Sequence, residues 1–229
     1  LRQERLPSII GNRQSQPIGG FFISLHERNT RRIMNEKRRL LGMTLDELKG
    51  VAFEAGLPGY AAKQMADWLY KKKVTSIAAM TNIASAKRAL LEKNFEVGAV
   101  PPSDLMKSVD GTIKYLYPAG PGNFVESVYI PTEDRATLCV SSQVGCKMNC
   151  LFCMTGKQGF TKNLSANEIL NQIQSLPETE ELTNIVFMGM GEPLDNVDEL
   201  FKVLEILTAS YGYAWSPKRI TVSTICLLY

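Results

Sequence analysis

Apolar residues recur every three or four positions between about residues 44 and 95, which predicts three short amphipathic helices. The first lies in "MTLDELKGVAFEAGLPGY", where Thr44 and Glu47 have the spacing of a capping box and Gly56 ends the helix. The second lies in "YAAKQMADWLYKK" and the third in "SAKRALLEKNF". We therefore predict a small helical domain over residues 34–105.

The apolar period changes to two after "PPSD", and this change predicts β-strands. "GTIKYLYP" and "NFVESVYIP" flank "AGPG" and should form a hairpin. Apolar strands in "RATLCVSS", "NIVFMG" and "ITVST" then alternate with helices in "SANEILNQIQSL", which has a capping box at Ser165 and Glu168, and in "NVDELFKVLEILTAS". The order predicts an α/β fold over residues 106–229, with three parallel strands of a doubly wound sheet or a partial (β/α) barrel. In both folds the chemistry lies at the carboxyl ends of the strands.

Composition narrows the choice of partners. The 229 residues are 45% hydrophobic, enough for a hydrophobic core, and no apolar run is long enough to span a bilayer, so we expect no membrane role. The formal net charge is only +3, but Lys and Arg concentrate toward the front, in "RRIMNEKRR" and "YKKK". The helical domain is therefore the better candidate for binding phosphate, although solvated helix faces would explain the same bases.

Three cysteines, Cys146, Cys150 and Cys153, fall within eight positions in "GCKMNCLFCMTGKQGF". A structural zinc site wants four ligands, and Cys139 or Cys226 could supply the fourth because the chain has a single histidine far from this loop. Inert buried thiols are a further explanation. A [4Fe-4S] cluster held by three thiolates would instead leave one iron free to bind a small molecule.

With Phe152 before the last cysteine, the C-x3-C-x2-C spacing resembles the signature of the radical S-adenosylmethionine (SAM) superfamily. "GMGEP" resembles the segment with which that superfamily holds the methionine amino group. Together, "RATLCVSSQVGCKMNCLFCMTGKQGFTKNL", "NIVFMGMGEPLDN" and "RITVST" resemble the RlmN/Cfr family of radical SAM RNA methyltransferases, and "GLPGYAAKQMADWLYKK" resembles the accessory RNA-binding domain of that family. The resemblance covers roughly residues 38–224, and it predicts the barrel rather than the doubly wound sheet.

The resemblance implies an enzyme that methylates C2 of adenine in 23S ribosomal RNA and transfer RNA through a methylated cysteine. Its cofactors would be a [4Fe-4S] cluster and SAM, and its partners would be those RNAs and an electron donor such as flavodoxin or ferredoxin. A cytoplasmic location and a monomer are expected. Two alternatives stay open: methylation of adenine C8, as in the Cfr branch, and a zinc-stabilised RNA-binding module without catalysis.

The resemblance also implies roles for individual residues. The cluster ligands would be Cys146, Cys150 and Cys153, and the SAM contacts would be Gly191, Glu192 and Ser223. Cys139 would be the thiol that resolves a covalent RNA adduct through a disulfide, and Glu126 would be the proton acceptor.

Three of these residues also have structural explanations. The period of two in "FVESVYI" places Glu126 on the same face as Val128 and Ile130, and an acid held among apolar side chains is a candidate for proton exchange near neutral pH. The alternative is an edge-strand glutamate that reaches solvent. Cys139 could equally be a small buried hydrophobe, and Ser223 could cap a turn.

Both ends of the chain depart from the family pattern. Residues 1–33 show no clear period and could be sequence upstream of a start at Met34 or, being rich in Arg, an organellar transit peptide. At the other end, Cys226 stands where the family has glycine, and the methyl-carrying cysteine of the family lies beyond Tyr229. We therefore expect a C-terminally truncated chain that could hold a labile cluster but would not complete methylation.

Overall fold

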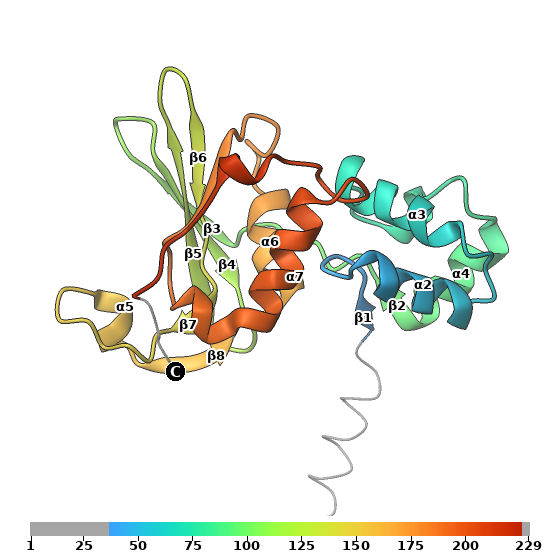
Figure 1. Cartoon of the computed structure of the whole chain (residues 1–229), viewed down its shortest axis with the longest axis horizontal. Helices are drawn as coiled ribbons and strands as arrows, with labels where there is room; N and C mark the ends of the chain where they lie inside the picture. The colour runs from blue at the N-terminus through green and yellow to red at the C-terminus, as the bar shows by residue number, and fades with distance from the viewer. Residues whose placement is uncertain (1–36, 226–229) are drawn as a thin grey trace, which may run out of the picture. The chain divides into compact units, whose positions relative to one another are not determined.

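The computed structural model describes residues 37–225 (Figure 1). These residues belong to one compact unit, Lys37–Tyr229. The predictions about residues 1–33, about a start at Met34 and about Cys226 lie outside the described residues.

The front of the described chain is helical, as its apolar period predicts. At the start of the first helix, the Thr44 hydroxyl accepts a hydrogen bond from the Glu47 N–H, and the Glu47 carboxylate accepts one from the Thr44 N–H at 2.8 Å, so the predicted capping box is confirmed. The predicted second helix is α-helical at first and then widens into a π-helical turn. The helical elements are α2 (Leu45–Glu54), α3 (Ala61–Ala66), η1 (Asp67–Lys71), η2 (Ile77–Ala79) and α4 (Ser85–Asn94).

Short parallel strands β1 (Arg38–Arg39) and β2 (Phe95–Glu96) close this helical part by pairing its two ends. The apolar faces of the helices bury Leu48, Val51 and Met65 completely. No helix in the described part of the chain is both long enough and apolar enough to cross a membrane.

A six-stranded mixed sheet follows, in the order β10-β9-β6-β5-β4-β3. Parallel pairing joins β6, β9 and β10, so three strands of this sheet are parallel, as predicted, and the predicted hairpin is β4 with β5. β3 was not predicted; it is exposed along its length and pairs antiparallel with β4 at the edge. The strands are β3 (Asp104–Lys107), β4 (Ile113–Pro118), β5 (Phe124–Pro131), β6 (Ala136–Cys139), β9 (Asn184–Phe187) and β10 (Ile220–Val222).

Two helices cover one face of this sheet: α6 (Ala166–Gln174) follows β6, and α7 (Val197–Thr208) follows β9 (Figure 1). The strands β6, β9 and β10 lie side by side in the sheet in the same order in which they follow along the chain. Both crossover connections therefore run in the same direction and place their helices on the same face. Apolar side chains of α7 such as Leu200 and Val203 are buried there. This arrangement is the one found in (β/α) barrels, whereas a doubly wound sheet would have helices on both faces.

On the antiparallel strands β4 and β5, buried tyrosine side chains continue the covered face of the sheet. The Tyr129 hydroxyl donates to the Glu181 carboxylate at 2.7 Å, and burial together with that carboxylate raises the pKa of Tyr129 to about 12. The opposite face of the sheet is open among the described residues, and it carries Glu126 and Cys139, whose side chains are both partly exposed. The sheet therefore separates a structural face from a face that is accessible to a substrate.

Candidate active site

The predicted site residues gather at one end of the parallel strands. Cys139 is the last residue of β6, the segment with Gly191 and Glu192 follows β9, and Ser223 follows β10. Since β6, β9 and β10 are parallel neighbours, their carboxyl ends meet at one edge of the sheet. The structure thus brings these residues together from segments more than 80 positions apart in the sequence.

The cysteine loop is the connection of a small hairpin that the sequence did not predict. Strands β7 (Gln143–Gly145) and β8 (Phe160–Asn163) pair antiparallel, and a short helix, α5 (Met154–Lys157), lies in the loop between them. Gly145 has a positive φ of 74°, and a Cβ there would lie 1.8 Å from the Gly159 carbonyl oxygen. A glycine is therefore required where the two strands approach. We call β7, the loop and β8 the cysteine hairpin.

Of the three hairpin cysteines, Cys146 is buried and Cys150 and Cys153 are partly exposed, and all three are free thiols. Burial raises the pKa of Cys146, against a lowering hydrogen bond from the Met148 N–H, and the neighbouring Cys153 and Cys150 thiols raise it further. The Cys146 thiol therefore lies within electrostatic range of the other two hairpin cysteines.

Cys153 behaves in the opposite way. Backbone N–H groups of Gly156 and Thr155 hydrogen-bond to its sulfur and lower the pKa of Cys153, which favours the thiolate. Within residues 37–225, no three His, Cys, Asp or Glu side chains form a group that could hold a metal ion. Such a group would hold a single ion, whereas in a [4Fe-4S] cluster each thiolate binds a different iron.

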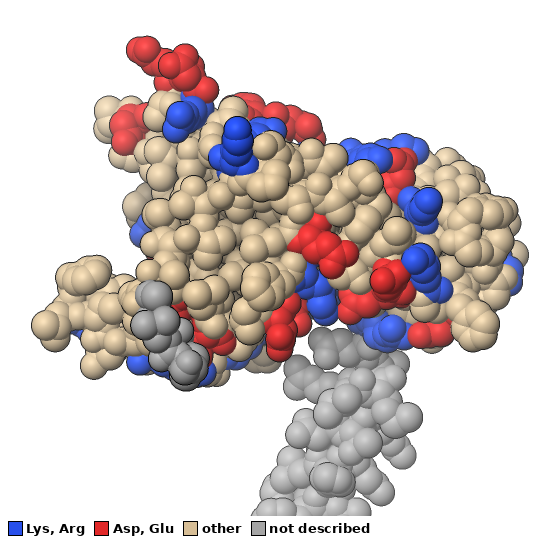
Figure 2. Space-filling model, viewed as in Figure 1, with Lys and Arg blue, Asp and Glu red and all other residues tan. Residues whose placement is uncertain are grey.

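The tip of the hairpin is apolar and exposed. Leu151, Phe152 and Met154 are 93%, 91% and 67% exposed. In the space-filling view the corresponding projection carries few charged side chains (Figure 2). Cys150 and Cys153 thus flank an exposed tip, while Cys146 lies nearer the buried base.

"GMGEP" forms a tight loop after β9 that packs against the segment leading into the cysteine hairpin. Gly191 has a φ of 98°, and a Cβ there would lie 2.5 Å from the Gln143 Cβ. The Glu192 carboxylate is buried and accepts hydrogen bonds from the Leu194 and Ile225 N–H groups, each at 3.1 Å. A carboxylate can accept further bonds, so these two contacts leave capacity for an ammonium group.

Ser223 is exposed just after β10, and its N–H donates to the Phe187 carbonyl at 3.4 Å. This contact places Ser223 at the end of β9, the strand that leads into "GMGEP".

Glu126 and Cys139 lie on the open face of adjacent strands. Cys139 pairs with Val128, which shares a face with Glu126, so the alternation is as predicted, but this is the open face of the sheet and it does not enclose Glu126 among apolar side chains. Glu126 lies on an interior strand and not on an edge strand; its carboxylate is half-exposed and lies 3.3 Å from the Lys114 ammonium. Burial raises the pKa of Cys139, although a hydrogen bond from the Met188 N–H lowers it, so this thiol stays protonated at neutral pH.

Sequence reasoning missed a buried polar segment, Ser141–Gln143, that connects these parts. The Ser141 hydroxyl donates to the carbonyl of Glu126 at 2.6 Å and accepts from the Met190 N–H at 2.8 Å. The N–H groups of Ser142 and Gln143 both donate to the Met190 carbonyl. The only signal in the sequence was three polar residues in the otherwise apolar run "LCVSSQVG".

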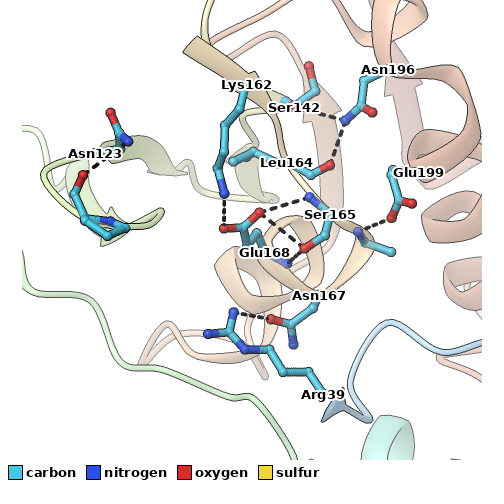
Figure 3. Close-up of polar contacts among 12 residues, drawn as sticks. Arg39, Asn123, Ser142, Lys162, Leu164, Ser165, Asn167, Glu168, Asn196 and Glu199 are labelled. Atoms are coloured by element: carbon cyan, nitrogen blue, oxygen red, sulfur yellow. Dashed lines mark hydrogen bonds and ion pairs between the residues drawn. The ribbon is translucent and has the colours of Figure 1, made fainter. Parts of the chain in front are cut away.

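Polar contacts around the start of α6 support the same region (Figure 3). The buried Asn196 amide donates to the carbonyls of Ser142 and Leu164 at 2.9 and 2.8 Å. Glu168 caps α6 through Ser165, confirming the second predicted capping box. A pocket of about 410 Å³ adjoins these contacts, but none of the predicted site residues lines it.

Family models match two parts of the chain. Residues 140–229 match the model described as "Radical SAM superfamily". Residues 38–97 match the model described as "Ribosomal RNA large subunit methyltransferase N-terminal domain". The first match contains the cysteine hairpin and the "GMGEP" loop, and the second coincides with the helical part.

Similar proteins agree with these matches. A "Probable dual-specificity RNA methyltransferase RlmN" of Parabacteroides distasonis is 84% identical over 192 residues, which are 84% of this chain and 56% of the relative. The "Dual-specificity RNA methyltransferase RlmN" of Geobacter sulfurreducens is 46% identical over 82% of this chain and 52% of the relative. The crystal structure of a radical SAM methyltransferase from Sphaerobacter thermophilus superposes with a TM-score of 0.76 at 37% identity, covering 83% of this chain and 57% of that one. The chain thus spans a little over half the length of these relatives.

Proposed function

The chain belongs to the RlmN family of radical SAM methyltransferases, and on this premise we propose that it contributes the catalytic edge of an enzyme that methylates C2 of adenine in 23S ribosomal RNA and transfer RNA. The observation that carries the proposal is the meeting of the cysteine hairpin, the "GMGEP" loop and Ser223 at the carboxyl ends of three parallel strands. Ordinary methyl transfer needs a nucleophilic acceptor atom, which adenine C2 is not.

The family implies a [4Fe-4S] cluster and SAM, which when bound supply a radical able to abstract hydrogen from an unactivated carbon. We propose that Cys146, Cys150 and Cys153 hold the cluster. This donor set fits, because the three thiols share one loop and Cys153 is biased toward the thiolate. Glu192 and Gly191 would hold the methionine part of SAM, with Ser223 as a further contact.

Two residues of the open face would act on the RNA. We propose that a carboxylate oxygen of Glu126 accepts the proton that leaves the adenine ring, and the ion pair with the Lys114 ammonium would orient that carboxylate on the open face. Cys139, on the neighbouring strand, would be the thiol that closes a disulfide with the methyl-carrying cysteine when the RNA product is released. Its protonated resting state is consistent with a thiol that must not react before then.

RNA would be bound in part by α2–α4. Residues 37–97 contain eleven Lys and Arg against six Asp and Glu. Some of these bases are paired, Arg38 with Glu54 and Lys49 with Asp46, so acidic and basic side chains alternate over this part (Figure 2). The remaining net positive charge of residues 37–97 would attract the phosphate backbone of RNA, which carries one negative charge per nucleotide. We further propose a cytoplasmic monomer that takes electrons from a flavodoxin or a ferredoxin.

The activity can be tested with a chimera in which the matching residues of this chain replace the matched 192-residue segment of the Parabacteroides distasonis relative. Expressed in a host that lacks adenine C2 methylation, the chimera should produce 2-methyladenosine in ribosomal and transfer RNA, as read by mass spectrometry. The matched variant Glu126→Gln should give at least 100-fold less product. 8-Methyladenosine would instead establish the C8 alternative. The absence of both methylated products would contradict the proposal.

The cofactor can be tested on the 229-residue chain itself. Anaerobic reconstitution with iron and sulfide should give a brown protein with broad visible absorption. A colourless protein containing one equivalent of zinc would support the non-catalytic RNA-binding module.

A further inference from the structure

Gln143 lies where the cysteine hairpin meets the "GMGEP" loop, and its side chain is completely buried. It is the first residue of β7, three positions before Cys146. A buried amide is costly when its hydrogen-bonding groups lack partners, so its contacts determine what can pack around it.

The Gln143 amide joins three segments. Its Oε1 accepts from the Glu192 N–H at 2.9 Å. Its Nε2 donates to the Asn163 side-chain oxygen at 2.8 Å and to an Asp195 carboxylate oxygen at 2.7 Å. Both amide hydrogens and the carbonyl are therefore used, on β8, on the "GMGEP" loop and on the turn η3 (Pro193–Asn196) that follows it.

A second contact, from the cysteine loop, joins the same segments. Lys147, next to Cys146, forms an ion pair with Asp195 at 2.8 Å, and the Asp195 side chain is only 12% exposed. One carboxylate thus binds both the base of the cysteine hairpin, through Gln143, and the start of the cysteine loop, through Lys147. Asp195 follows Glu192 by three residues, so the same contacts tie the hairpin to the segment that carries the "GMGEP" loop.

We propose that Gln143 is a positioning residue that holds the cysteine loop and the "GMGEP" loop in one fixed relation, so that the open iron and the carboxylate that binds the methionine amino group face the same SAM molecule. This inference rests on the proposed function. It assigns to Gln143 no contact with SAM or iron; the residue acts through Glu192 and Asp195. Loops set about 1 Å out of register lose much of the benefit of pre-organisation.

The chain offers a matched control in Asn171 of α6. Its amide is also buried and also makes three hydrogen bonds, with both backbone groups of Val100 at 2.8 Å and with the Ser175 hydroxyl at 2.7 Å. None of these partners belongs to the candidate site. Gln143→Met and Asn171→Leu each replace an amide by an apolar side chain of similar shape, and each removes three buried hydrogen bonds.

The experiment uses the reconstituted 229-residue chain, with iron content and equilibrium dialysis of radiolabelled SAM as the readouts. Gln143→Met should keep the iron content of the unmodified chain but bind SAM at least tenfold more weakly. Asn171→Leu should bind SAM like the unmodified chain. Unchanged SAM affinity in Gln143→Met, or equal weakening in both variants, would overturn the proposal.

A charge-based pair covers the case in which Gln143→Met does not fold. Gln143→Glu places a carboxylate against Asp195 and should weaken SAM binding, whereas adding Asp195→Asn supplies an amide donor opposite the new carboxylate and should restore part of the affinity. Absence of any rescue counts against the positioning role.

If the unmodified chain binds no SAM, the proposed function fails separately, and hydrogen exchange of the cluster-free chain then decides the inference. Faster exchange in β8 for Gln143→Met but not for Asn171→Leu is the expected result. Identical exchange in the two variants would refute the role of Gln143.

Discussion

The base and the tip of the cysteine hairpin differ in almost every physical respect. At the base, Gln143 is fully buried, and its amide makes three hydrogen bonds to other segments. At the tip, Leu151 and Phe152 are more than nine-tenths exposed. Cys146 is buried near the base, whereas Cys150 and Cys153 flank Leu151 and Phe152 at the tip.

This difference indicates how the hairpin divides its tasks. A base tied by buried polar contacts is specific in geometry, because each unpaired group would be costly. An exposed apolar tip contributes little to folding, and its side chains are free to contact a ligand. The base should therefore control stability and loop register, and the tip cysteines should control cofactor content.

The largest effect is expected at the tip for Cys150→Ala. Removing one of three thiolate ligands should abolish the cluster, leaving less than about a tenth of the iron and visible absorption of the unmodified chain. The partly exposed thiol contributes little to packing, so the thermal midpoint of the cluster-free protein should hardly change. A full cluster spectrum after anaerobic reconstitution of Cys150→Ala would show that the ligand assignment is wrong.

At the base, Gly191→Ala should lower the free energy of unfolding of the cluster-free chain by about 2–5 kcal/mol. Its Cβ would lie 2.5 Å from the Gln143 Cβ, and its φ of 98° is strained for any residue with a side chain. Urea unfolding measures the change.

Gly50→Ala in the exposed part of α2 is the control for Gly191→Ala, because nothing lies within 4 Å of the position that a Cβ would take there. This substitution should be neutral or stabilise by up to about 1 kcal/mol. Equal effects for the two glycines would contradict the close packing at the base.

Thiol alkylation should separate Cys153 from Cys139 in the cluster-free chain. Hydrogen bonds to its sulfur lower the pKa of Cys153, while burial raises the pKa of Cys139. Since only the thiolate reacts, iodoacetamide should modify Cys153 several-fold faster at pH 7. Between pH 7 and 9 the Cys139 rate should rise about tenfold per pH unit, and the Cys153 rate should level off earlier.

Peptide mass spectrometry follows both thiols in the alkylation experiment, and the chain unfolded in urea provides the reference in which their rates converge. Equal native rates at pH 7 would contradict the assignment.

The smallest effect is expected for Phe152→Ala at the tip, within about 0.5 kcal/mol of the free energy of unfolding of the cluster-free chain. Val144→Ala at the base, where the side chain is only 7% exposed, should cost about 1–2 kcal/mol. A larger loss for Phe152 than for Val144 would reverse the comparison between tip and base.

Local patterns in the sequence predicted much of this fold. Two capping boxes, at Thr44 and Ser165, depend on residues three positions apart, and the alternation of apolar strands with helices predicted β6, β9 and β10. The cysteine hairpin was missed because β7 and β8 are short and mostly polar. Which face of the sheet is covered also could not be predicted from alternation alone, since it depends on where α6 and α7 pack.

Gln143 escaped prediction for a different reason. Its side-chain partners are 20, 49 and 52 residues away, so no local pattern marks it. The family resemblance supplied the cysteines, Glu192 and Ser223 as site residues, and the structure shows which of them lie at one edge. What connects them is apparent only from long-range hydrogen bonds.

The most direct test of the central claim, that the cysteine hairpin and the "GMGEP" loop together present one open iron to SAM, is electron paramagnetic resonance of the reduced, reconstituted chain with and without SAM. We predict the signal of a reduced [4Fe-4S] cluster whose shape changes when SAM is added, and a weaker change in Gln143→Met. A cluster signal that is identical with and without saturating SAM would contradict the account.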